Sequence, residues 1–442
     1  MDCPIDRFDA VDHDPARGGP SIAHARLRGA NWFSVGPNPL VFWLEYDRER
    51  IEGELDLARS AHLNSLRVWI SHEAFLVRGE RALADLDHLL GAACARGVVL
   101  LLVLTDFAFG WNGKGAVERW SGTPGVFLMA DPKRHGAYLR FLDAVLERVA
   151  AFPPYLVMFD VANEPLSNPW NEADAVTTVP SLADDGRAAV VTFLVEVFER
   201  ISTQMPRHER TVGQSVQGII GRPGFLDRFP LTFQSFHGGY RSAKEIRELA
   251  ETASRLSPLP VVLTETCASP ALLPHAVRAA REFGVGFMFW GLMKGFNEWN
   301  TWTGLFHPDG AVTSLDGVAA LIGGPADRFV ERPHDDSEFP PLVFEEQIDL
   351  AFRRLVTSLP VTRDNVDEVR SLPWELLFWG TYADDRATHL ELIELHAGIE
   401  DADAAGDVEE AHRRVAAFLE RAARAPRPRR PGGGPGPIPR SV

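Results

Sequence analysis

Cysteine is scarce in this sequence, with three residues among 442, and none of the three belongs to a CxxC pair. So few cysteines, one of them at position 3, predict that no disulfide framework forms and favour a reducing compartment.

Long apolar runs are missing as well. The longest, residues 98–104, has the length of a strand and falls short of the roughly 20 residues that span a bilayer. Residues 1–19 contain no apolar core of a signal peptide, so we expect a cytoplasmic protein that does not associate with a membrane.

Positive charge is also in short supply. The chain has 45 Lys and Arg against 61 Asp and Glu, a formal net charge of −16, and such a surface repels the phosphates of nucleic acids. Motifs for bound metals and cofactors are missing too, because there is no HExxH, no GxSxG elbow and no Walker or dinucleotide-binding loop. The sequence therefore predicts no nucleic-acid partner, no metal and no cofactor, and it suits an enzyme with a neutral substrate.

Eight apolar runs of strand length follow one another in the first two thirds of the chain. Most lack a two-residue alternation of apolar and polar residues, as expected for strands buried on both faces of a parallel sheet. They lie at residues 27–33, 63–69, 98–105, 155–162, 210–215, 231–236, 260–265 and 285–290.

Amphipathic stretches of helix length, with apolar residues three and four apart, separate these runs. They lie at 48–62, 82–96, 133–150, 187–204, 243–255 and 272–283, and 313–322 closes the series. The glycine-rich connection at 218–229 has room for only a short helix. Eight strand–helix units over about 300 residues predict an α/β fold, the (β/α)8 barrel. The competing fold is an open doubly wound sheet, which usually has fewer strands and often a glycine-rich first turn that this chain lacks.

The composition changes at both ends of the chain. Residues 1–20 are rich in Asp, Pro and Gly, and residues 425–442 are basic and rich in Pro and Gly, so both are predicted to be disordered. The predicted barrel covers 21–323 and a polar, Pro-rich linker covers 324–342. Residues 343–424 have the pattern of helices only and contain no chemical motif, which predicts a small all-helical appendage.

Two glutamates stand at the ends of the fourth and seventh predicted strands, Glu164 in YLVMFDVANEP and Glu265 in PVVLTET. They are 101 residues apart, which is three strand–helix repeats of about 34 residues, so both are expected at the mouth of the barrel. Glycoside hydrolysis needs such a pair, one carboxyl group protonated and the other ionised, and a separation of about 5–5.5 Å favours retention over inversion. Their proximity is expected to raise the pKa of the acid. The alternative is that each glutamate pairs with an arginine at the rim.

Residues 25–322 resemble the retaining glycoside hydrolases of clan A, most closely family 5 of cellulases and mannanases. The residues that carry the resemblance lie at the ends of predicted strands, and they are Arg67, Asn163-Glu164-Pro165, Thr264-Glu265 and Trp290. The resemblance implies that Glu164 is the acid/base, that Glu265 is the nucleophile and that Asn163 contacts the sugar 2-hydroxyl.

Further side chains are expected around this pair. A guanidinium at Arg67 would hold Glu265 ionised and oriented, although an architectural ion pair is the alternative. His237 and Tyr240 end the sixth strand in TFQSFHGGY and are suited to hydrogen-bond the nucleophile or the sugar. The family usually has one residue between its His and Tyr, whereas two glycines intervene here, which leaves the direction of the Tyr240 ring open. Trp290 offers an apolar face to the sugar ring.

The third strand departs from the family, which often has a histidine near that strand's end. Here the strand ends in LTDFAFGWN with Asp106, and binding a sugar hydroxyl or capping a turn are equal alternatives. Several tryptophans in the expected mouth loops are candidate sugar subsites, with simple packing as the alternative for each: Trp32, Trp111, Trp170, Trp299 and Trp302.

The sequence thus predicts a retaining β-glycoside hydrolase that acts on β-linked oligosaccharides or glycosides. Two alternatives stay open. One is a non-catalytic carbohydrate-binding barrel whose helical appendage recruits a partner, and the other is a transglycosylase that uses the same carboxylates.

Overall fold

The computed structural model divides into two compact units, Met1–Leu342 and Val343–Val442. The residues that it describes are 3–14, 19–34, 39–106, 132–165, 184–216, 224–294, 303–332, 355–363, 365, 366, 369, 372, 395, 398, 399, 402 and 405–424. Among these residues, no helix combines the length and the apolar character needed to cross a membrane.

The first unit contains a closed barrel of parallel strands, in which β10 pairs with β3 to complete the ring. Chain order and spatial order agree around the barrel, so each strand lies beside the next in sequence. Each of the eight predicted runs overlaps one of these strands, with ends that differ by a few residues, which confirms the (β/α)8 fold. The strands are β3 (Arg28–Asn31), β4 (Ser65–Trp69), β5 (Val99–Val103), β6 (Val157–Asn163), β7 (Glu209–Ser215), β8 (Gln234–His237), β9 (Val261–Thr266) and β10 (Gly286–Phe289).

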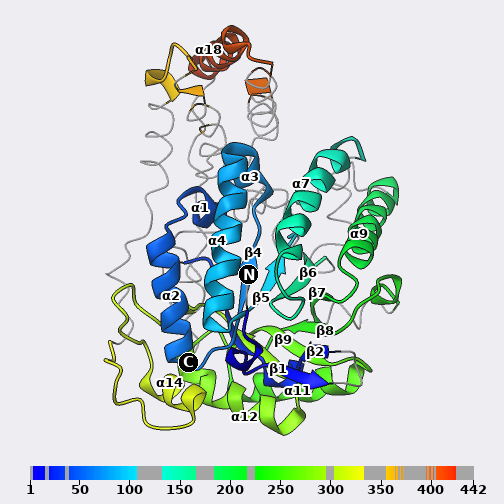
Figure 1. Ribbon diagram of the computed structural model, residues 1–442, viewed down its shortest axis with the longest axis vertical. Helices are drawn as coiled ribbons and strands as arrows, with labels where there is room; N and C mark the ends of the chain where they lie inside the picture. The colour runs from blue at the N-terminus through cyan, green and yellow to red at the C-terminus, as the bar shows by residue number, and fades with distance from the viewer. Residues whose placement is uncertain are drawn as a thin grey trace. The chain divides into compact units, whose positions relative to one another are not determined.

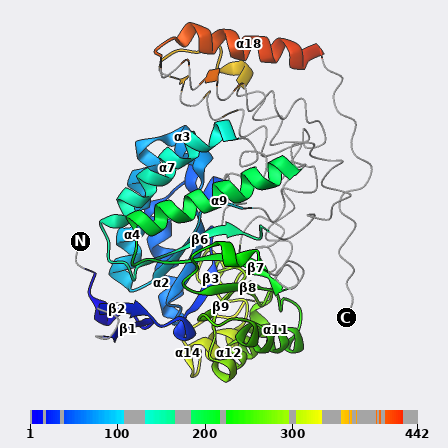
Figure 2. The same cartoon turned by 90° about the vertical axis from the view of Figure 1, so that its right-hand side faces the viewer.

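Helices cover the outside of the barrel (Figures 1 and 2). They are α1 (Pro39–Leu44), α2 (Arg48–Ser60), α3 (His72–Arg78), α4 (Glu80–Arg96), α7 (Pro132–Ala150), α9 (Asp184–Gln204), α11 (Ala243–Leu256), α12 (Leu273–Phe283) and α14 (Leu315–Ile322), with 3-10 turns η3 (His24–Arg26), η5 (Leu226–Arg228) and η6 (Pro270–Leu272). Local signals set several ends. Asp47 caps α2 by accepting from the Arg50 N–H, and Gly97 ends α4 in the left-handed conformation.

The core lies inside the barrel and between the barrel and the helices. Every residue of β4, β5, β6 and β9 is buried, which explains why these strands appear in the sequence as apolar runs without alternation. Polar residues within them therefore stand out, because a buried polar group needs a partner.

The N-terminal segment is ordered where the structure describes it, so the prediction that residues 1–20 are disordered is wrong for those residues. A 3-10 turn, η1 (Ile5–Arg7), leads to an antiparallel pair of β1 (Val11–Asp14) and β2 (Gly19–Ile22). Cys3 and Cys94 form a disulfide, against the expectation from cysteine scarcity, and the Tyr155 hydroxyl donates to the Cys3 carbonyl oxygen at 2.7 Å. Cys3, Phe8 and Ala10 of the segment are buried. A composition averaged over residues 1–20 does not reveal these few buried positions.

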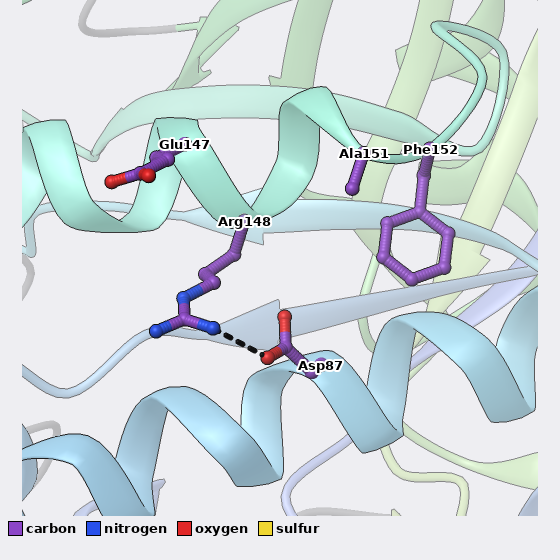
Figure 3. Close-up of a pocket in the computed structure, with 5 residues that line it drawn as sticks. All are labelled: Asp87, Glu147, Arg148, Ala151 and Phe152. Atoms are coloured by element: carbon purple, nitrogen blue, oxygen red, sulfur yellow. Dashed lines mark hydrogen bonds and ion pairs between the residues drawn. The ribbon is translucent and has the colours of Figure 1, made fainter. Parts of the chain in front are cut away.

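A shallow groove on the outer helical layer is lined by the neighbouring helices α4 and α7 (Figure 3). Its lining residues are Asp87, Glu147, Arg148, Ala151 and Phe152, and Arg148 Nη1 lies 2.9 Å from Asp87 Oδ2 across it. Most of the lining comes from the carboxyl end of α7, which precedes β6. The groove therefore does not lie at the carboxyl ends of the strands, where barrel active sites form.

The described part of the expected linker belongs to the first unit, because Glu331 forms a bridge with Val312 and the Arg332 N–H donates to the Val312 carbonyl oxygen. In the second unit, helix α18 (Val408–Arg424) lies within residues 343–424, where the sequence predicts helices only, and it buries Val415 and Phe418. Much of residues 343–407 and all of the tail from residue 425 lie outside the described residues.

Candidate active site

The acid/base candidate Glu164 follows β6 in an unusual backbone conformation. Its φ is 52°, in the left-handed region, and its N–H donates to the Gly213 carbonyl oxygen at 2.7 Å. Such a conformation costs about 1–3 kcal/mol for a residue other than glycine and persists only when its surroundings hold it. Pro165, which cannot donate to a ladder, follows directly. Strand β6 therefore ends just before Glu164, whose carboxyl group is directed toward the mouth of the barrel.

The nucleophile candidate Glu265 lies within β9 and its side chain is 6% exposed. Three side chains donate to its oxygens: Arg67 Nη1 at 2.6 Å, Trp290 Nε1 at 3.1 Å and the Tyr240 hydroxyl at 3.2 Å. Burial raises the pKa of Tyr240 well above its usual value, and the nearby Glu265 adds to the rise. The phenol therefore stays protonated and donates.

Tyr240 reaches Glu265 although two glycines separate it from His237. Both glycines have positive φ, 140° at Gly238 and 65° at Gly239, values that other residues adopt rarely. The two glycines let the chain turn sharply, so the extra residue lengthens the loop without redirecting the phenol. This settles the direction of the ring that the sequence left open.

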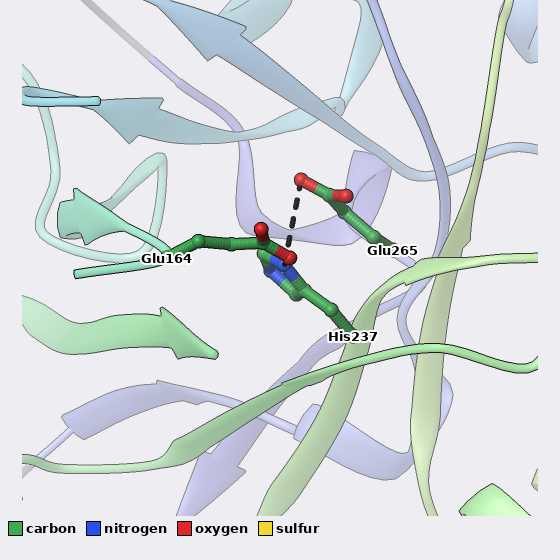
Figure 4. A group of neighbouring side chains, drawn as sticks. All are labelled: Glu164, His237 and Glu265. Atoms are coloured by element: carbon green, nitrogen blue, oxygen red, sulfur yellow. Dashed lines mark hydrogen bonds and ion pairs between the residues drawn. The ribbon is translucent and has the colours of Figure 1, made fainter. Parts of the chain in front are cut away.

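His237 lies between the two carboxyl groups (Figure 4). Its Nδ1 is 2.7 Å from Glu164 Oε1 and 3.6 Å from Glu265 Oε1. One ligand atom from each of these three residues lies within 4.8 Å of the others, so the two carboxyl groups converge as predicted. The same three side chains have the chemistry of a metal-ligand set, and the absence of a metal stays a prediction.

Arg67, on β4, is fully buried and binds side chains from several strands. Its Nε and Nη2 donate to Asp160 Oδ2, Nη1 donates to Asn31 Oδ1 at 2.9 Å, and Nη2 donates to Asn163 Oδ1 at 2.6 Å. Burial lowers the pKa of Arg67, but the charges of Asp160 and Glu265 outweigh it and the pKa is raised. The guanidinium is thus a permanent positive charge beside the nucleophile candidate.

Asp160 and Asn31 are members of this network that the sequence analysis missed. The signal for Asp160 was its place as a charged residue inside the buried strand VMFDVAN. Its Oδ1 also accepts the Gly213 N–H at 2.9 Å. Asn31 donates to the carbonyl oxygens of Thr264 and Phe289, a role that depends on three strands meeting and that no local pattern reveals.

An aromatic wall, formed by Phe33, Trp69 and Trp290, lies beside the carboxyl groups. The two indoles stack with ring centres 5.8 Å apart and planes inclined by 22°, and Phe33 meets both edge-on. The Arg67 guanidinium lies 4.6 Å from the Trp69 ring centre, a favourable cation–π distance. Trp290 is thus part of a packed aromatic cluster beside Glu265, and the stacking of a sugar ring on its face stays a prediction.

The other candidate tryptophans divide into two groups. Trp32 is buried, packs edge-on against Phe42 and donates its Nε1–H to Glu54 Oε2 at 2.6 Å, so for this residue packing is confirmed. The rest lie outside the described residues, and they are Trp111, Trp170, Trp299 and Trp302.

Asp106, just after β5, accepts hydrogen bonds from two buried side chains. Its Oδ2 accepts from Trp69 Nε1 at 2.9 Å and its Oδ1 accepts from Asn163 Nδ2 at 2.9 Å. The side chain is fully buried, and it joins the aromatic wall to the residue before Glu164.

No protein-family model matches the chain, and no curated protein matches it either. Several solved structures do match the chain in fold. The exo-β-1,4-mannosidase Op5Man5 from Opitutaceae bacterium strain TAV5 aligns with a TM-score of 0.53 and 18% identity over 72% of this chain and 61% of that chain, so this chain spans about three fifths of it. The chain has the barrel fold of this mannosidase. This likeness in fold agrees with the sequence resemblance to family 5.

Two further matches are weaker. The endo-1,4-β-mannanase from Rhizomucor miehei has a TM-score of 0.46 and 13% identity over 68% of this chain and 94% of that chain. A GH5_18 structure from Streptomyces cattleya in complex with GlcNAc has a TM-score of 0.48 and 15% identity over 79% of this chain and 97% of that chain.

Proposed function

We propose that this chain is a retaining β-glycoside hydrolase in which Glu164 is the acid/base and Glu265 the nucleophile. The observation that carries the proposal is the convergence of the two carboxyl groups, with an oxygen of each within 4.8 Å of the other. A pair this close leaves no room for a water between the carboxylate and the sugar, which favours a covalent intermediate.

In the first step, a Glu265 oxygen attacks the anomeric carbon while Glu164 gives its proton to the departing glycosidic oxygen. The Glu265–sugar ester forms and the glycosidic bond breaks. In the second step, Glu164 removes a proton from water, and the water oxygen displaces Glu265 from the anomeric carbon. Two inversions leave the product with the β configuration of the substrate.

The surroundings suit these two roles. Arg67, Tyr240 and Trp290 all donate to Glu265, which favours its ionised form and its attack. The Glu164 side chain is more open, at 17% exposure, and it can meet both the leaving group and water. Several buried carboxylates around a single arginine also favour the positive charge that develops on the sugar ring.

The proposed substrate is a neutral β-linked oligosaccharide or glycoside, and Asn163 is proposed to contact its 2-hydroxyl. The likeness in fold to an exo-β-1,4-mannosidase places β-mannosides among the first compounds to assay. Cytoplasmic location and the absence of a nucleic-acid or membrane partner remain proposals from composition.

The proposal is tested with a panel of nitrophenyl β-glycosides. We expect turnover by the wild type on at least one, loss of about 10³-fold or more in kcat for Glu265→Ala, and unchanged kcat for the exposed control Glu248→Ala. NMR of the first product should show the β anomer. Azide should restore activity to Glu265→Ala and give the α-glycosyl azide.

Three outcomes would contradict it. An α-anomeric first product would mean inversion, and sugar binding without turnover on any glycoside would favour the non-catalytic barrel. Transfer to an added acceptor sugar at the expense of hydrolysis would identify a transglycosylase.

A further inference from the structure

Asp106 stands where the family that this chain resembles often has a histidine. We propose that Asp106 is a positioning residue that fixes the Asn163 amide for the sugar 2-hydroxyl and couples that contact to the aromatic wall. The inference rests on the proposed function and deepens it, because it assigns the recognition of one substrate hydroxyl to a carboxylate that does not react.

The first argument is the match between acceptors and donors. Each oxygen of the Asp106 carboxylate accepts from a different buried side chain, Oδ2 from Trp69 Nε1 and Oδ1 from Asn163 Nδ2, both at 2.9 Å. The indole N–H can only donate, and the Asn163 amide keeps its nitrogen toward Asp106 because Arg67 donates to its oxygen. The site therefore requires a side chain with two acceptors at the reach of Asp106.

Other side chains of similar size do not meet this requirement. A neutral imidazole has one acceptor nitrogen, and an asparagine has one acceptor oxygen and one donor nitrogen. Asparagine at this position would place an N–H against either Trp69 or Asn163, whichever way its amide turned. A buried donor without an acceptor is costly, so the departure from histidine matches the two donors present here.

The second argument concerns the Asn163 amide. Arg67 Nη2 donates to its Oδ1 at 2.6 Å, while one hydrogen of its Nδ2 goes to Asp106. These two bonds set both the flip and the tilt of the amide, and Nδ2 keeps a second hydrogen for a substrate oxygen. A donor fixed before the substrate arrives needs no reorganisation in the transition state, where a 2-hydroxyl contact strengthens.

The third argument is the connection to the apolar side of the site. Trp69 is buried, bonded to Asp106 through Nε1 and stacked on Trp290, whose own Nε1 donates to Glu265. One carboxylate therefore fixes both the polar contact and the inner layer of the stacked indoles. We expect changes at Asp106 to alter recognition of the sugar ring more than the reacting carboxyl groups.

The test uses Asp106→Asn in the full chain, with the aryl β-glycoside turned over fastest by the wild type and its 2-deoxy analogue. The wild type should prefer the 2-hydroxy substrate in kcat/KM, and Asp106→Asn should reduce that preference about ten- to hundredfold. The matched control is Asp85→Asn, which removes a buried carboxylate of α4 that pairs with Arg78. Its preference should equal that of the wild type.

A second measurement does not depend on turnover. In ¹H–¹⁵N spectra, Asp106→Asn should shift the Trp69 indole N–H, assigned with Trp69→Phe, and the Asn163 side-chain amide, while Asp85→Asn leaves both in place. Equal losses on the 2-hydroxy and 2-deoxy substrates, or unmoved resonances, would overturn the role of Asp106. If the wild type hydrolyses no glycoside, the proposed function fails by itself, and the spectra still decide whether Asp106 holds Asn163 and Trp69.

Discussion

At the scale of single residues, a missing side chain matters as much as those present. Gly213, on β7, lies where a Cβ atom would be 2.7 Å from His237 Nε2 and 2.9 Å from Asp160 Oδ2. These distances are shorter than the contacts that real Cβ atoms make with non-bonded atoms. Any larger residue at this position must therefore displace the histidine or the aspartate. The position of His237 against Glu164 thus depends on a glycine in the neighbouring strand.

We predict that Gly213→Ala lowers proton donation by Glu164. Activity on glycosides with poor leaving groups should fall about tenfold or more, activity on dinitrophenyl glycosides should fall less because they need no acid, and stability should drop by about 1–3 kcal/mol. The control is Gly53→Ala in α2, where a Cβ meets nothing within 4 Å and a helix gains about 1 kcal/mol. Equal losses on both classes of substrate would contradict the link to Glu164.

A second residue, Glu54, connects pH to stability. It is buried in α2 and accepts from Trp32 Nε1 and Ser34 Oγ, which hold the segment after β3. Burial raises its pKa from 4.5 to about 7, although the Ser34 and Trp32 bonds oppose the shift. Because the folded pKa is raised, its contribution to stability is fully present below about pH 4.5 and is lost as the pH rises through about 7.

We therefore predict that Glu54→Gln changes the pH dependence of unfolding. Between pH 4.5 and pH 8 the free energy of unfolding of the wild type should fall relative to the variant by roughly 3 kcal/mol. Urea titrations at several pH values measure this difference, in which constant costs of the substitution cancel. A difference that stays level, or that changes in the other direction, would show that Glu54 is ionised in the folded protein.

At the scale of elements, the N-terminal segment is attached to the barrel's outer layer by more than packing. The Cys3–Cys94 disulfide links the segment to α4 across 91 residues of sequence, and Arg7 Nη1 donates to the Ala95 carbonyl oxygen at 2.6 Å. Closing a loop of this length removes entropy from the unfolded chain, and such bonds typically stabilise by about 2–4 kcal/mol.

We predict that reduction lowers the midpoint of thermal unfolding of the wild type, whereas a Cys3→Ser/Cys94→Ser variant does not respond to reductant. Thiol titration in denaturant should find one thiol before reduction, from the buried Cys267, and three afterwards. Three thiols before reduction would contradict the bond and would favour the reducing compartment expected from composition.

At the scale of the whole molecule, the barrel and most of the site could be predicted because their signals are local. Strands buried on both faces appear as apolar runs, and Glu164 and Glu265 end two of them. Asn31, Asp160 and the stack of Trp69 on Trp290 were missed, because each depends on strands that lie side by side only after the ring has formed. The order of the N-terminal segment was missed because an average composition does not reveal which few of its residues are buried.

Asn31 lies where the first and last strands of the barrel, β3 and β10, pair to close the ring. From β3 it donates to the backbone of β9 and β10, and its Oδ1 accepts from Arg67. The side chain that bridges the first and last strands of the barrel therefore also holds the buried cation beside Glu265. A chain whose first and last barrel strands have not yet met would lack the backbone contacts that fix Asn31, so the full set of acceptors around Arg67 is assembled only when the ring closes.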